Sequence, residues 1–525
     1  MSKRAKVILT NSLTTYARMC INFLIGLLTT RITLSLLGLK SPPAAESFGI
    51  FVLLMSVMST SLFLNESLQK ASVRYLTICF HGTDKDAIRR FFHASWAMSM
   101  VFGLVITFCV LIGAPFLISL FNISSSLSLQ AIRVMQIAAF SHGVVSILQP
   151  WTASLLAQDR YTLNNILNTL QQFLILFGLV LLSFIPVNFA GGPLVQLAIV
   201  WLGPAVLIPL GTAAYVNFRS PLLRLNFKFL QWNECKQVIS LGGWSTVVGL
   251  GSSLYERLDQ IIINLFLGPV FNTFYGVVVQ LENYVSRIVT ALSEVILPTA
   301  TRLGATGSRW EKQQLIVRAT RYALTLALPC AGSIIVFRRE IIEIWLGKGF
   351  AEAIYILPLA MLLMSLRVPM FITWPYLTAV NKLKWPAVAL LIDALINVPL
   401  SILYLKIFHL GLFGVVLGTL STNVVRFVFF QSPYIARQIE MPVWKYWNEA
   451  YTRPLVSAIL FFAILFGIEW SSPSIIVTAL AVALASAFYA LSTWYWILEE
   501  YEQNLFLGIV RNLSFRKLST DSSVA

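Results

Sequence analysis

The chain has 525 residues, of which 57% are hydrophobic and only 11% are charged, and its mean hydropathy is +0.78. A water-soluble domain carries roughly 25% charged residues, so this composition excludes an ordinary soluble protein. The formal net charge is +16, but the Lys and Arg residues gather in short loops between apolar runs, which argues against a nucleic-acid-binding surface.

Long apolar runs separated by short charged turns extend along almost the whole chain. A helix needs roughly 20 apolar residues to cross ~30 Å of hydrocarbon, and it satisfies its backbone N–H and C=O groups internally. Barrel strands are excluded because they would be about 10 residues long with alternating polarity. We therefore expect an all-α polytopic membrane protein with about 14 transmembrane helices. The expected spans are residues 10–38, 48–66, 94–121, 131–157, 163–186, 193–217, 238–267, 273–298, 315–337, 352–380, 386–408, 411–431, 453–470 and 474–497.

The charges of the connecting loops predict how the chain crosses the membrane. Basic residues concentrate in the connections 67–93, 218–237 and 299–314. Connections between them, such as 122–130 and 268–272, contain no Lys or Arg. Basic loops stay on the cytoplasmic side of a membrane. This pattern predicts a multi-pass membrane protein with both termini in the cytoplasm.

A faint internal repeat with an offset of about 222 residues indicates two matched halves. The corresponding residues are Leu155, Ala157, Asp159 and Arg160 in the first half and Leu377, Ala379, Asn381 and Lys382 in the second. Because each half holds an even number of spans, the halves share one orientation, as in transporters built from parallel repeats. The expected organisation is an N-terminal six-helix lobe (1–217), a cytoplasmic interlobe linker (218–237), a C-terminal six-helix lobe (238–440), helices 13 and 14 (441–498) and a cytoplasmic tail (499–525). The linker mixes basic and apolar residues, so it is either an interfacial helix or an ordinary inner loop.

Arginine residues inside the spans are candidate ligands for a transported molecule. A charge in the bilayer costs at least ~2.5–3.5 kcal/mol, so it is expected to face a water-filled cavity or a partner. Guanidinium groups bind phosphate through two parallel hydrogen bonds and stay charged when desolvated, which points to an anionic cargo such as a lipid-linked diphosphate. For Arg257 and Arg287, structural pairing with a nearby carboxylate is the alternative. The candidate cavity residues are Arg18, Arg31, Arg257, Arg287 and Arg367.

Carboxylates inside the spans are candidates for coupling transport to H⁺ or Na⁺. They are Glu256, Asp259, Glu282 and Asp393. No other cofactor is expected. The five cysteines form no Cys-x-x-Cys pair, so neither a metal site nor a disulfide framework is indicated.

Short motifs in the sequence bear on three features: the energy source of transport, a metal site and helix packing. The chain has no GxxxxGK[ST] loop, which excludes an ATP-driven pump of the P-loop type. Asp84-x-Asp86 resembles a metal motif of sugar-nucleotide enzymes, but Arg89 and Arg90 follow it, so we interpret it as solvated surface. The motif Gly414-x-x-x-Gly418 predicts close packing between helices.

The stretch from Tyr255, YERLDQIIINLFLGPVFNTFYGVVVQLENYVSRIVTALSEVILPTATRL, resembles the seventh and eighth helices of polysaccharide (O-antigen, Wzx-type) flippases. The segments TTRITLSLLG and FGIFVLLMSV resemble their first two helices, and the similarity covers most of residues 10–440. These flippases belong to the MOP superfamily, together with multidrug (MATE) exporters and the lipid II flippase. Arg257 and Asp259 match positions of the flippase motif, but the resemblance transfers no functional role to them. The first helix of this chain differs from that of many drug exporters. Those exporters keep an acidic residue in the helix, whereas this chain has Arg18 and Arg31 there.

The resemblance implies two lobes of six core helices plus two further helices, with helices 1, 2, 7 and 8 bordering a central cavity. It implies a transporter of the bacterial inner (plasma) membrane. Such a transporter flips an undecaprenyl-diphosphate-linked oligosaccharide, a precursor of O-antigen or other cell-surface polysaccharide, from the inner to the outer leaflet by alternating access. Its expected partners are this lipid-linked cargo, membrane lipid, and the polysaccharide polymerase and glycosyltransferases of the same pathway. We expect a monomer that binds no nucleic acid.

Two other hypotheses remain open. One is a cation-coupled multidrug exporter of the MATE type. The other is a membrane-embedded polymerase or ligase. Such an enzyme needs a sizeable outer loop, and the longest one expected here is 338–351, so we predict that the chain is not an enzyme.

Overall fold

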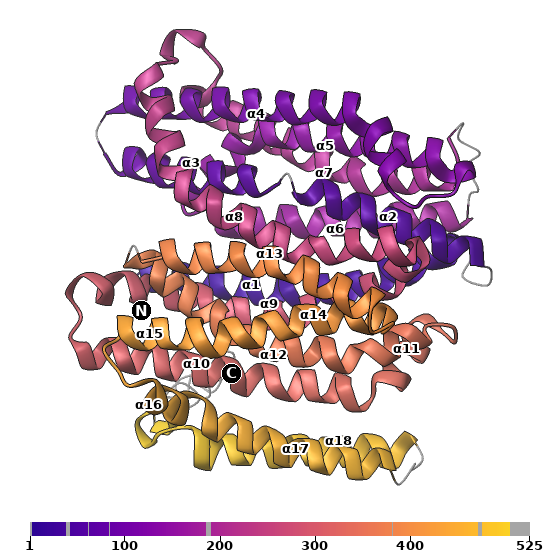
Figure 1. Cartoon of the computed structure of the whole chain (residues 1–525). Coiled ribbons are helices and arrows are strands. Elements are labelled where there is room, and N and C mark those ends of the chain that lie inside the picture. Colours follow the sequence, from indigo (N-terminus) through magenta and orange to yellow (C-terminus); the bar gives the residue numbers. More distant parts are fainter. Residues whose placement is uncertain are drawn as a thin grey trace, which may run out of the picture. The chain divides into compact units, whose positions relative to one another are not determined.

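The computed structural model describes the backbone of residues 3–37, 42–60, 62–82, 84–184, 191–380, 382–470 and 475–504. Within these ranges the regular structure is helical and contains no β-strand (Figure 1). Eleven helices of the described ranges are long and apolar enough to cross a membrane. The prediction of an all-α, multi-pass membrane protein is therefore confirmed, whereas the total of about fourteen spans stays a prediction.

The helices follow one another with short connections. Those of the first half are α1 (Lys3–Leu36), α2 (Pro42–Thr60), α3 (Leu62–His81), α4 (Lys85–Leu120), α5 (Ser125–Ala157), α6 (Tyr161–Phe184) and α7 (Pro193–Arg219). Those of the second half are α8 (Trp232–Leu267), α9 (Pro269–Thr306), α10 (Arg309–Val336), α11 (Arg338–Leu346), α12 (Ala351–Ala379), α13 (Lys384–Lys406), α14 (Gly411–Arg426), α15 (Ser432–Gln438), α16 (Val443–Trp447), α17 (Arg453–Trp470) and α18 (Ile475–Ser492).

The chain packs into two compact units whose boundaries fall inside α9, α11, α12 and α14 and between α12 and α13. The first unit comprises Met1–Tyr284, Ile342–Ile356 and Leu383–Thr422. The second comprises Val285–Ile341, Leu357–Lys382 and Asn423–Ala525. The lobe boundaries expected from the sequence rest on the internal repeat, and they stay a prediction.

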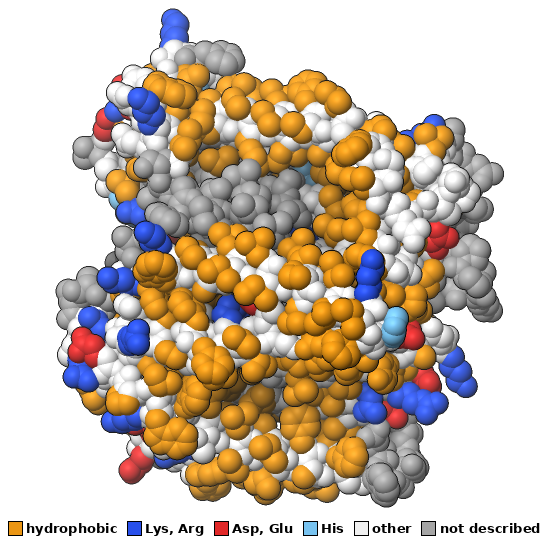
Figure 2. Space-filling view, viewed as in Figure 1, with side chains coloured by type: hydrophobic (Ala, Val, Ile, Leu, Met, Phe, Trp, Pro, Cys, Tyr) orange, Lys and Arg blue, Asp and Glu red, His pale blue; other side chains and the backbone are white. Residues whose placement is uncertain are grey.

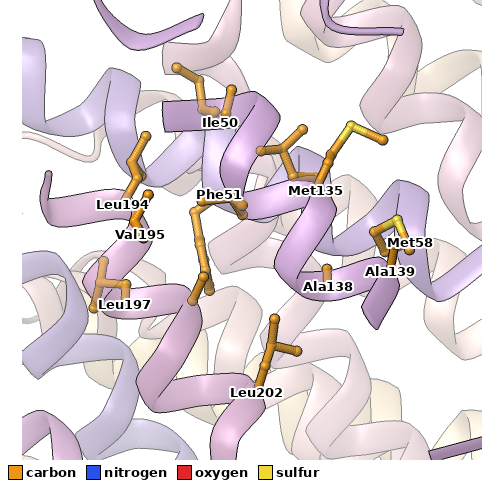
Figure 3. Packing of buried hydrophobic residues seen from close by; sticks show 14 of the residues in the cluster. Ile50, Phe51, Met58, Met135, Ala138, Ala139, Leu194, Val195, Leu197 and Leu202 are labelled. Carbon is orange, nitrogen blue, oxygen red and sulfur yellow. The ribbon is translucent and has the colours of Figure 1, made fainter. Parts of the chain in front are cut away.

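One hydrophobic core cluster of the first unit, to which α4 and α6 add residues, is built mainly by α2, α5 and α7. Figure 3 shows Ile50, Phe51 and Met58 of α2 beside side chains of the other two helices. Small residues such as Ala138 and Ala139 of α5 are fully buried, which lets the neighbouring helices approach closely. In the same unit α5 packs along both α4 and α7 (Figure 1).

The expected loop 67–93 differs from the structure, because α3 occupies most of it. Its buried residues are Ser67, Ala71, Ser72, Leu76 and Cys79. They follow the spacing of a helix, with gaps of three or four positions and one adjacent pair, which places them on one face. The opposite face carries exposed Glu66, Lys70 and Arg74. These charges lower the hydropathy averaged over a window, so the predicted span ends at residue 66. The structure shows instead that α3 continues to His81 as an amphipathic helix that packs on α4, α5 and α8.

The connection between α7 and α8 is also different from an interfacial helix. It consists of two single 3₁₀ turns, Pro221–Leu223 and Phe227–Phe229, and α8 begins at Trp232. The expected outer loop 338–351 contains a short helix, α11.

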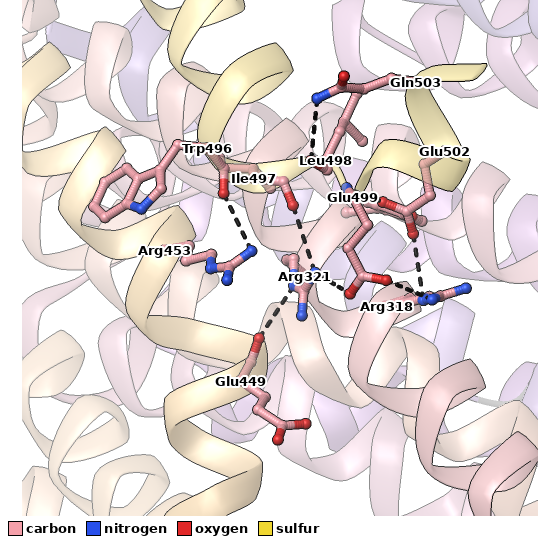
Figure 4. A network of polar contacts seen from close by, with 11 residues as sticks. Arg318, Arg321, Glu449, Arg453, Trp496, Ile497, Leu498, Glu499, Glu502 and Gln503 are labelled. Atoms are coloured by element: carbon pink, nitrogen blue, oxygen red, sulfur yellow. Dashed lines mark hydrogen bonds and ion pairs between the residues drawn. The ribbon is translucent and has the colours of Figure 1, made fainter. Parts of the chain in front are cut away.

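In the second unit, polar contacts fasten the end of α18 to α10 (Figure 4). Arg321 is 4% exposed and donates to the backbone carbonyls of Glu449, at 3.1 Å, and Ile497, at 3.4 Å. These carbonyls belong to two π-helical segments, Asn448–Thr452 and Thr493–Ile497. Arg321 also contacts the Glu499 carboxylate at 3.2 Å. A π-helical turn interrupts the usual helical hydrogen bonds, and the guanidinium supplies donors at that point.

Two neighbouring pairs extend this network. Arg318 forms ion pairs with Glu499 and Glu502 (Figure 4). Tyr322, on the same helix, donates to Glu502. Three side chains of α10 thereby hold two carboxylates of the chain that follows the last described span.

The surface agrees with a lipid environment. Figure 2 shows apolar side chains over most of the visible face, with basic and acidic side chains gathered mainly toward its margins. Exposed large apolar residues occur along the spans, for example Ile112 of α4 and Leu395 of α13. Such residues are costly in water and favourable against acyl chains.

Candidate functional site

A buried carboxylate, Asp259, lies at the centre of a polar cluster in the first unit. It is on α8 and is 2% exposed. Tyr275 of α9 donates its hydroxyl to Asp259 Oδ2 at 3.0 Å, and Thr419 of α14 donates to the same oxygen at 2.7 Å. Asn397 of α13 donates from Nδ2 to Oδ1 at 2.9 Å. Four helices thus meet at one carboxylate inside an otherwise apolar region.

A second row of contacts fixes these donors. Ser401 lies one turn after Asn397 on α13 and donates to Asn397 Oδ1 at 3.0 Å. Thr419 lies 3.3 Å from the same oxygen. Hydrogen bonds from neutral groups stabilise a buried carboxylate, which would otherwise be very costly away from water. The cluster is therefore organised around the charge of Asp259.

The packing of α13 against α14 brings the cluster together. A Cβ atom on Gly418 would lie 2.4 Å from Ser401 Oγ and 3.0 Å from Ser401 Cα, so only glycine permits this approach. Thr419 is the next residue and therefore reaches Asn397. The close helix packing predicted from Gly414-x-x-x-Gly418 is present at this glycine.

The remaining predicted carboxylates are placed as follows. Asp393 is buried on α13, one turn before Asn397, so it lies on the same side of that helix. Glu282 is buried on α9. The side chain of Glu256 lies outside the described residues. No group of three or more His, Cys, Asp or Glu side chains within the described residues is arranged to hold a metal ion.

The five predicted arginines are distributed over both units. Arg18 and Arg257 are partly buried and Arg31 is exposed, all three in the first unit. Arg287 is exposed and Arg367 is partly buried, both in the second. Their role in binding phosphate stays a prediction.

Polar contacts also join α1 to α9 within the first unit. The Thr30 hydroxyl donates to Gln280 Oε1 at 2.8 Å, and Gln280 Nε2 donates to the carbonyl of Gly26 at 3.2 Å. The same amide donates to the Tyr284 hydroxyl at 2.7 Å. A Cβ atom at position 26 would lie 2.4 Å from that hydroxyl, so a larger residue there would displace the Tyr284 side chain. The indole of Trp345 donates to the carbonyl of Leu27 at 2.9 Å.

Sequence reasoning missed most of these residues because they are neutral. Asn397, Thr419 and Gln280 are neutral polar residues within membrane spans, where such residues usually serve only to join helices. The available signal for Asn397 was its position one turn after Asp393. In the second unit, Arg426 is 7% exposed and donates to Asn423 Oδ1 at 2.7 Å, a buried guanidinium that the sequence reasoning left without a role.

The Asp84-x-Asp86 motif does not form a metal site. Asp84 caps the start of α4 by accepting from the backbone N–H groups of Asp86 and Ala87, at 2.8 and 3.1 Å. It also forms an ion pair with Arg90. The interpretation as exposed surface agrees with this geometry.

Comparisons with known proteins agree with the resemblance seen in the sequence. A family model described as "Polysaccharide biosynthesis protein" matches residues 44–355. The chain is 22% identical to EpsK, an uncharacterised membrane protein of Bacillus subtilis (strain 168), over 462 residues that cover 85% of this chain and 88% of EpsK.

Solved structures show the same fold. An inward-facing multidrug resistance MATE family transporter of the MOP superfamily matches with a TM-score of 0.66 and 14% identity, over 82% of this chain and 98% of that one. The lipid II flippase MurJ in an inward closed conformation matches with a TM-score of 0.64 and 14% identity, over 92% of this chain and 98% of that one. The predicted MOP-type fold is therefore confirmed.

Proposed function

Because the chain belongs to the family of polysaccharide biosynthesis proteins, we propose that it is a flippase of lipid-diphosphate-linked oligosaccharide, the precursor of a cell-surface polysaccharide such as O-antigen. Its fold is shared with a lipid flippase and with a drug exporter, which supports a transporter rather than an enzyme. The cargo would cross the bacterial inner membrane by alternating access, with both termini of the chain in the cytoplasm.

The arginines support an anionic cargo. Arg18, Arg257 and Arg367 are partly buried on helices of the membrane region. A guanidinium at such a depth costs several kcal/mol unless it faces a partner or a polar cavity, and binding the diphosphate of the cargo is the function we propose for these residues. The prenyl chain of the cargo would remain in lipid while its diphosphate and sugars are bound by the protein.

The contacts between α1 and α9 support a reversible closure. They are hydrogen bonds between neutral groups, each worth only about 0.5–1.5 kcal/mol net. A set of such bonds can stabilise one of the two states of a transporter and still break when the protein changes to the other state, as alternating access requires.

The observation that carries the coupling part of the proposal is the Asp259 cluster. A ligand moves an equilibrium between two states only if it binds them unequally. A carboxylate on α8 that is held by side chains from α9, α13 and α14 changes its surroundings whenever these helices move. We assign Asp259, with Thr419 and Asn397 beside it, as the site at which H⁺ or Na⁺ acts. One carboxylate among hydroxyl and amide oxygens suits a singly charged cation better than Ca²⁺ or Mg²⁺.

An export assay tests this assignment. In cells that lack the chromosomal gene, Asp259→Asn should abolish export of surface polysaccharide while the protein accumulates normally, since the substitution keeps the size of the side chain and removes its charge. Ser401→Ala is the matched control. It removes an outer hydrogen bond of the same cluster and should leave most export intact. Wild-type export by the Asp259→Asn protein would refute the coupling role.

Proteoliposomes then identify the ion. Flipping of a fluorescent prenyl-diphosphate glycan is measured under a Na⁺ gradient and, separately, under a proton gradient. The gradient that drives the wild-type protein should have no effect on Asp259→Asn. If neither gradient changes the wild-type rate, the transporter is not driven by these ions.

The similarity to a MATE drug transporter favours a second candidate, a cation-coupled multidrug exporter. Cells lacking the gene would then become sensitive to cationic dyes, and surface polysaccharide would be unchanged. If the chain is a flippase, cells lacking the gene should instead lose surface polysaccharide and show unchanged sensitivity to cationic dyes.

A further inference from the structure

The connection between α7 and α8 is fastened to the start of α4 by a buried histidine. His93 is 2% exposed, and its Nε2 atom accepts from the backbone N–H of Asn226 at 2.8 Å. Because Nε2 faces a donor, Nδ1 carries the proton and donates to the carbonyl of Arg89 at 2.6 Å. The imidazole therefore holds the middle of the connection in one place.

Further contacts fix both halves of the connection. The Arg89 guanidinium lies over the Phe229 ring, 4.9 Å from its centre. Arg224 Nε donates to the carbonyl of Asn217 at 3.3 Å. Leu223 is fully buried. A connection that only joins two parts of a chain needs none of these contacts, so its exposed face is held in a defined position.

The acidic side chain of this segment is withdrawn from the surface. Between residues 218 and 236 the sequence contains one acid, Glu234. It is 9% exposed and forms an ion pair with Arg90 at 3.2 Å. The exposed charged residues are all basic, namely Arg219, Arg224, Lys228 and Lys236.

Large apolar side chains stand among these basic residues. Phe218 is 82% exposed and Trp232 is 63% exposed, and Leu225 and Leu230 are exposed between them. They lie where α7 ends and α8 begins, at the edge of the membrane region. Aromatic residues favour the headgroup level of a bilayer, and basic residues favour anionic lipids there.

We propose that this face, formed by Phe218, Arg219, Lys228, Trp232 and Lys236, is a docking surface for anionic phospholipid headgroups. The basic residues attract the phosphates, and the apolar side chains enter the boundary between headgroups and acyl chains. The general excess of basic residues on one side of a membrane protein accounts for the sign of the charge. It does not account for a fixed backbone, a buried acid and exposed aromatic residues at the same place.

The test compares two triple variants of the full-length protein in nanodiscs. The first carries Arg219→Gln, Lys228→Gln and Lys236→Gln, none of which is a side chain that anchors the connection. The control carries Arg74→Gln, Lys382→Gln and Arg437→Gln, three exposed basic residues expected on the same membrane side. Both variants lose the same charge. Their melting temperatures in pure phosphatidylcholine should equal that of the wild type, which shows that they fold.

Two measurements report binding. Native mass spectrometry measures retention of phosphatidylglycerol, and hydrogen exchange measures protection of residues 218–236 when phosphatidylglycerol is added. The affinity should fall about fivefold for each basic residue removed, or about a hundredfold in the first variant, and should change little in the control. Trp232→Ala should also weaken retention, because it removes an apolar contact and no charge.

Other outcomes overturn the proposal. Equal losses in both triple variants would mean that only net charge matters. Unchanged retention in the first variant would mean that lipid binds elsewhere. Protection of 218–236 by a soluble acidic peptide, with no effect of phosphatidylglycerol, would assign the surface to an acidic protein instead.

Discussion

The side chains of Thr30 and Gln280, which are 250 positions apart in the sequence, form a hydrogen bond of 2.8 Å between α1 and α9. Gln280 also donates to the carbonyl of Gly26 on α1 and to Tyr284 on its own helix, so one amide has three partners, two of them on α1. This arrangement makes Gln280 the residue whose loss should most affect the closure of α1 on α9.

Gln280→Leu should lower the free energy of unfolding by about 1–3 kcal/mol, because it leaves buried polar partners unsatisfied. Thermal or denaturant unfolding of the purified protein measures this change. Gln260→Leu on α8 is the matched control. Gln260 is 6% exposed and its Oε1 atom has no hydrogen-bond partner, so the same substitution should be neutral or stabilising. Equal effects of the two substitutions would contradict the role assigned to Gln280.

Gly418→Ala should destabilise the protein by about 1–3 kcal/mol, since the new methyl group overlaps Ser401 and separates α13 from α14. It should also weaken ion-dependent transport, because Thr419 moves away from Asp259. The control is Gly211→Ala on α7, where no atom lies within 4 Å of the added Cβ. There the substitution should be neutral or slightly stabilising. A stable, fully active Gly418→Ala protein would mean that the cluster tolerates separation of these helices.

Glu499 gives a prediction about pH. Burial alone would raise the pKa of Glu499, but hydrogen bonds and charge from Arg321 and Arg318 outweigh it and hold the pKa below its usual value of 4.5. A carboxyl group whose pKa is lower in the folded protein stabilises the fold above its unfolded pKa and loses this effect as pH falls through the folded pKa. The stability difference between the wild type and Glu499→Gln should therefore be largest near neutral pH and shrink below about pH 4.5. A difference that stays constant over this range would show that the ion pair does not contribute.

Arg31→Ala and Arg257→Ala should each abolish polysaccharide export at normal protein level if these residues bind the phosphates of the cargo. Arg133→Ala provides the comparison, because Arg133 is exposed on α5 and was not assigned to the cavity. Quantitative staining of surface polysaccharide measures the outcome. Export at the wild-type level by both Arg31→Ala and Arg257→Ala would reject the phosphate role.

The sequence was sufficient to predict the fold class and most spans, because runs of apolar residues report directly on burial in lipid. It failed at α3, where apolar residues occupy only one face and charges on the other face interrupt the hydropathy signal. It also predicted an interfacial helix in the linker as one alternative. The two 3₁₀ turns found there depend on His93, which lies more than a hundred positions earlier, and no local pattern contains that contact.

The candidate site was predicted in part. Asp259 and Asp393 stood out because a carboxylate in a membrane span is costly and therefore noticeable. Tyr275, Asn397 and Thr419 are neutral, so nothing in their own segments distinguished them from residues that merely join helices. Their role follows only from the meeting of four helices, which sequence periodicity does not specify.

The π-helical segments near Arg321 have a consequence for aligning this chain with its relatives. Each such turn accommodates one residue more than an α-helix needs, so the lipid-facing pattern shifts by about 100° after it. A relative without the extra residue would match this chain before Asn448 and again after Thr452 only if a single-position gap is placed between them. Alignments that forbid gaps inside helices would assign outward-facing residues of the last two spans to the wrong side.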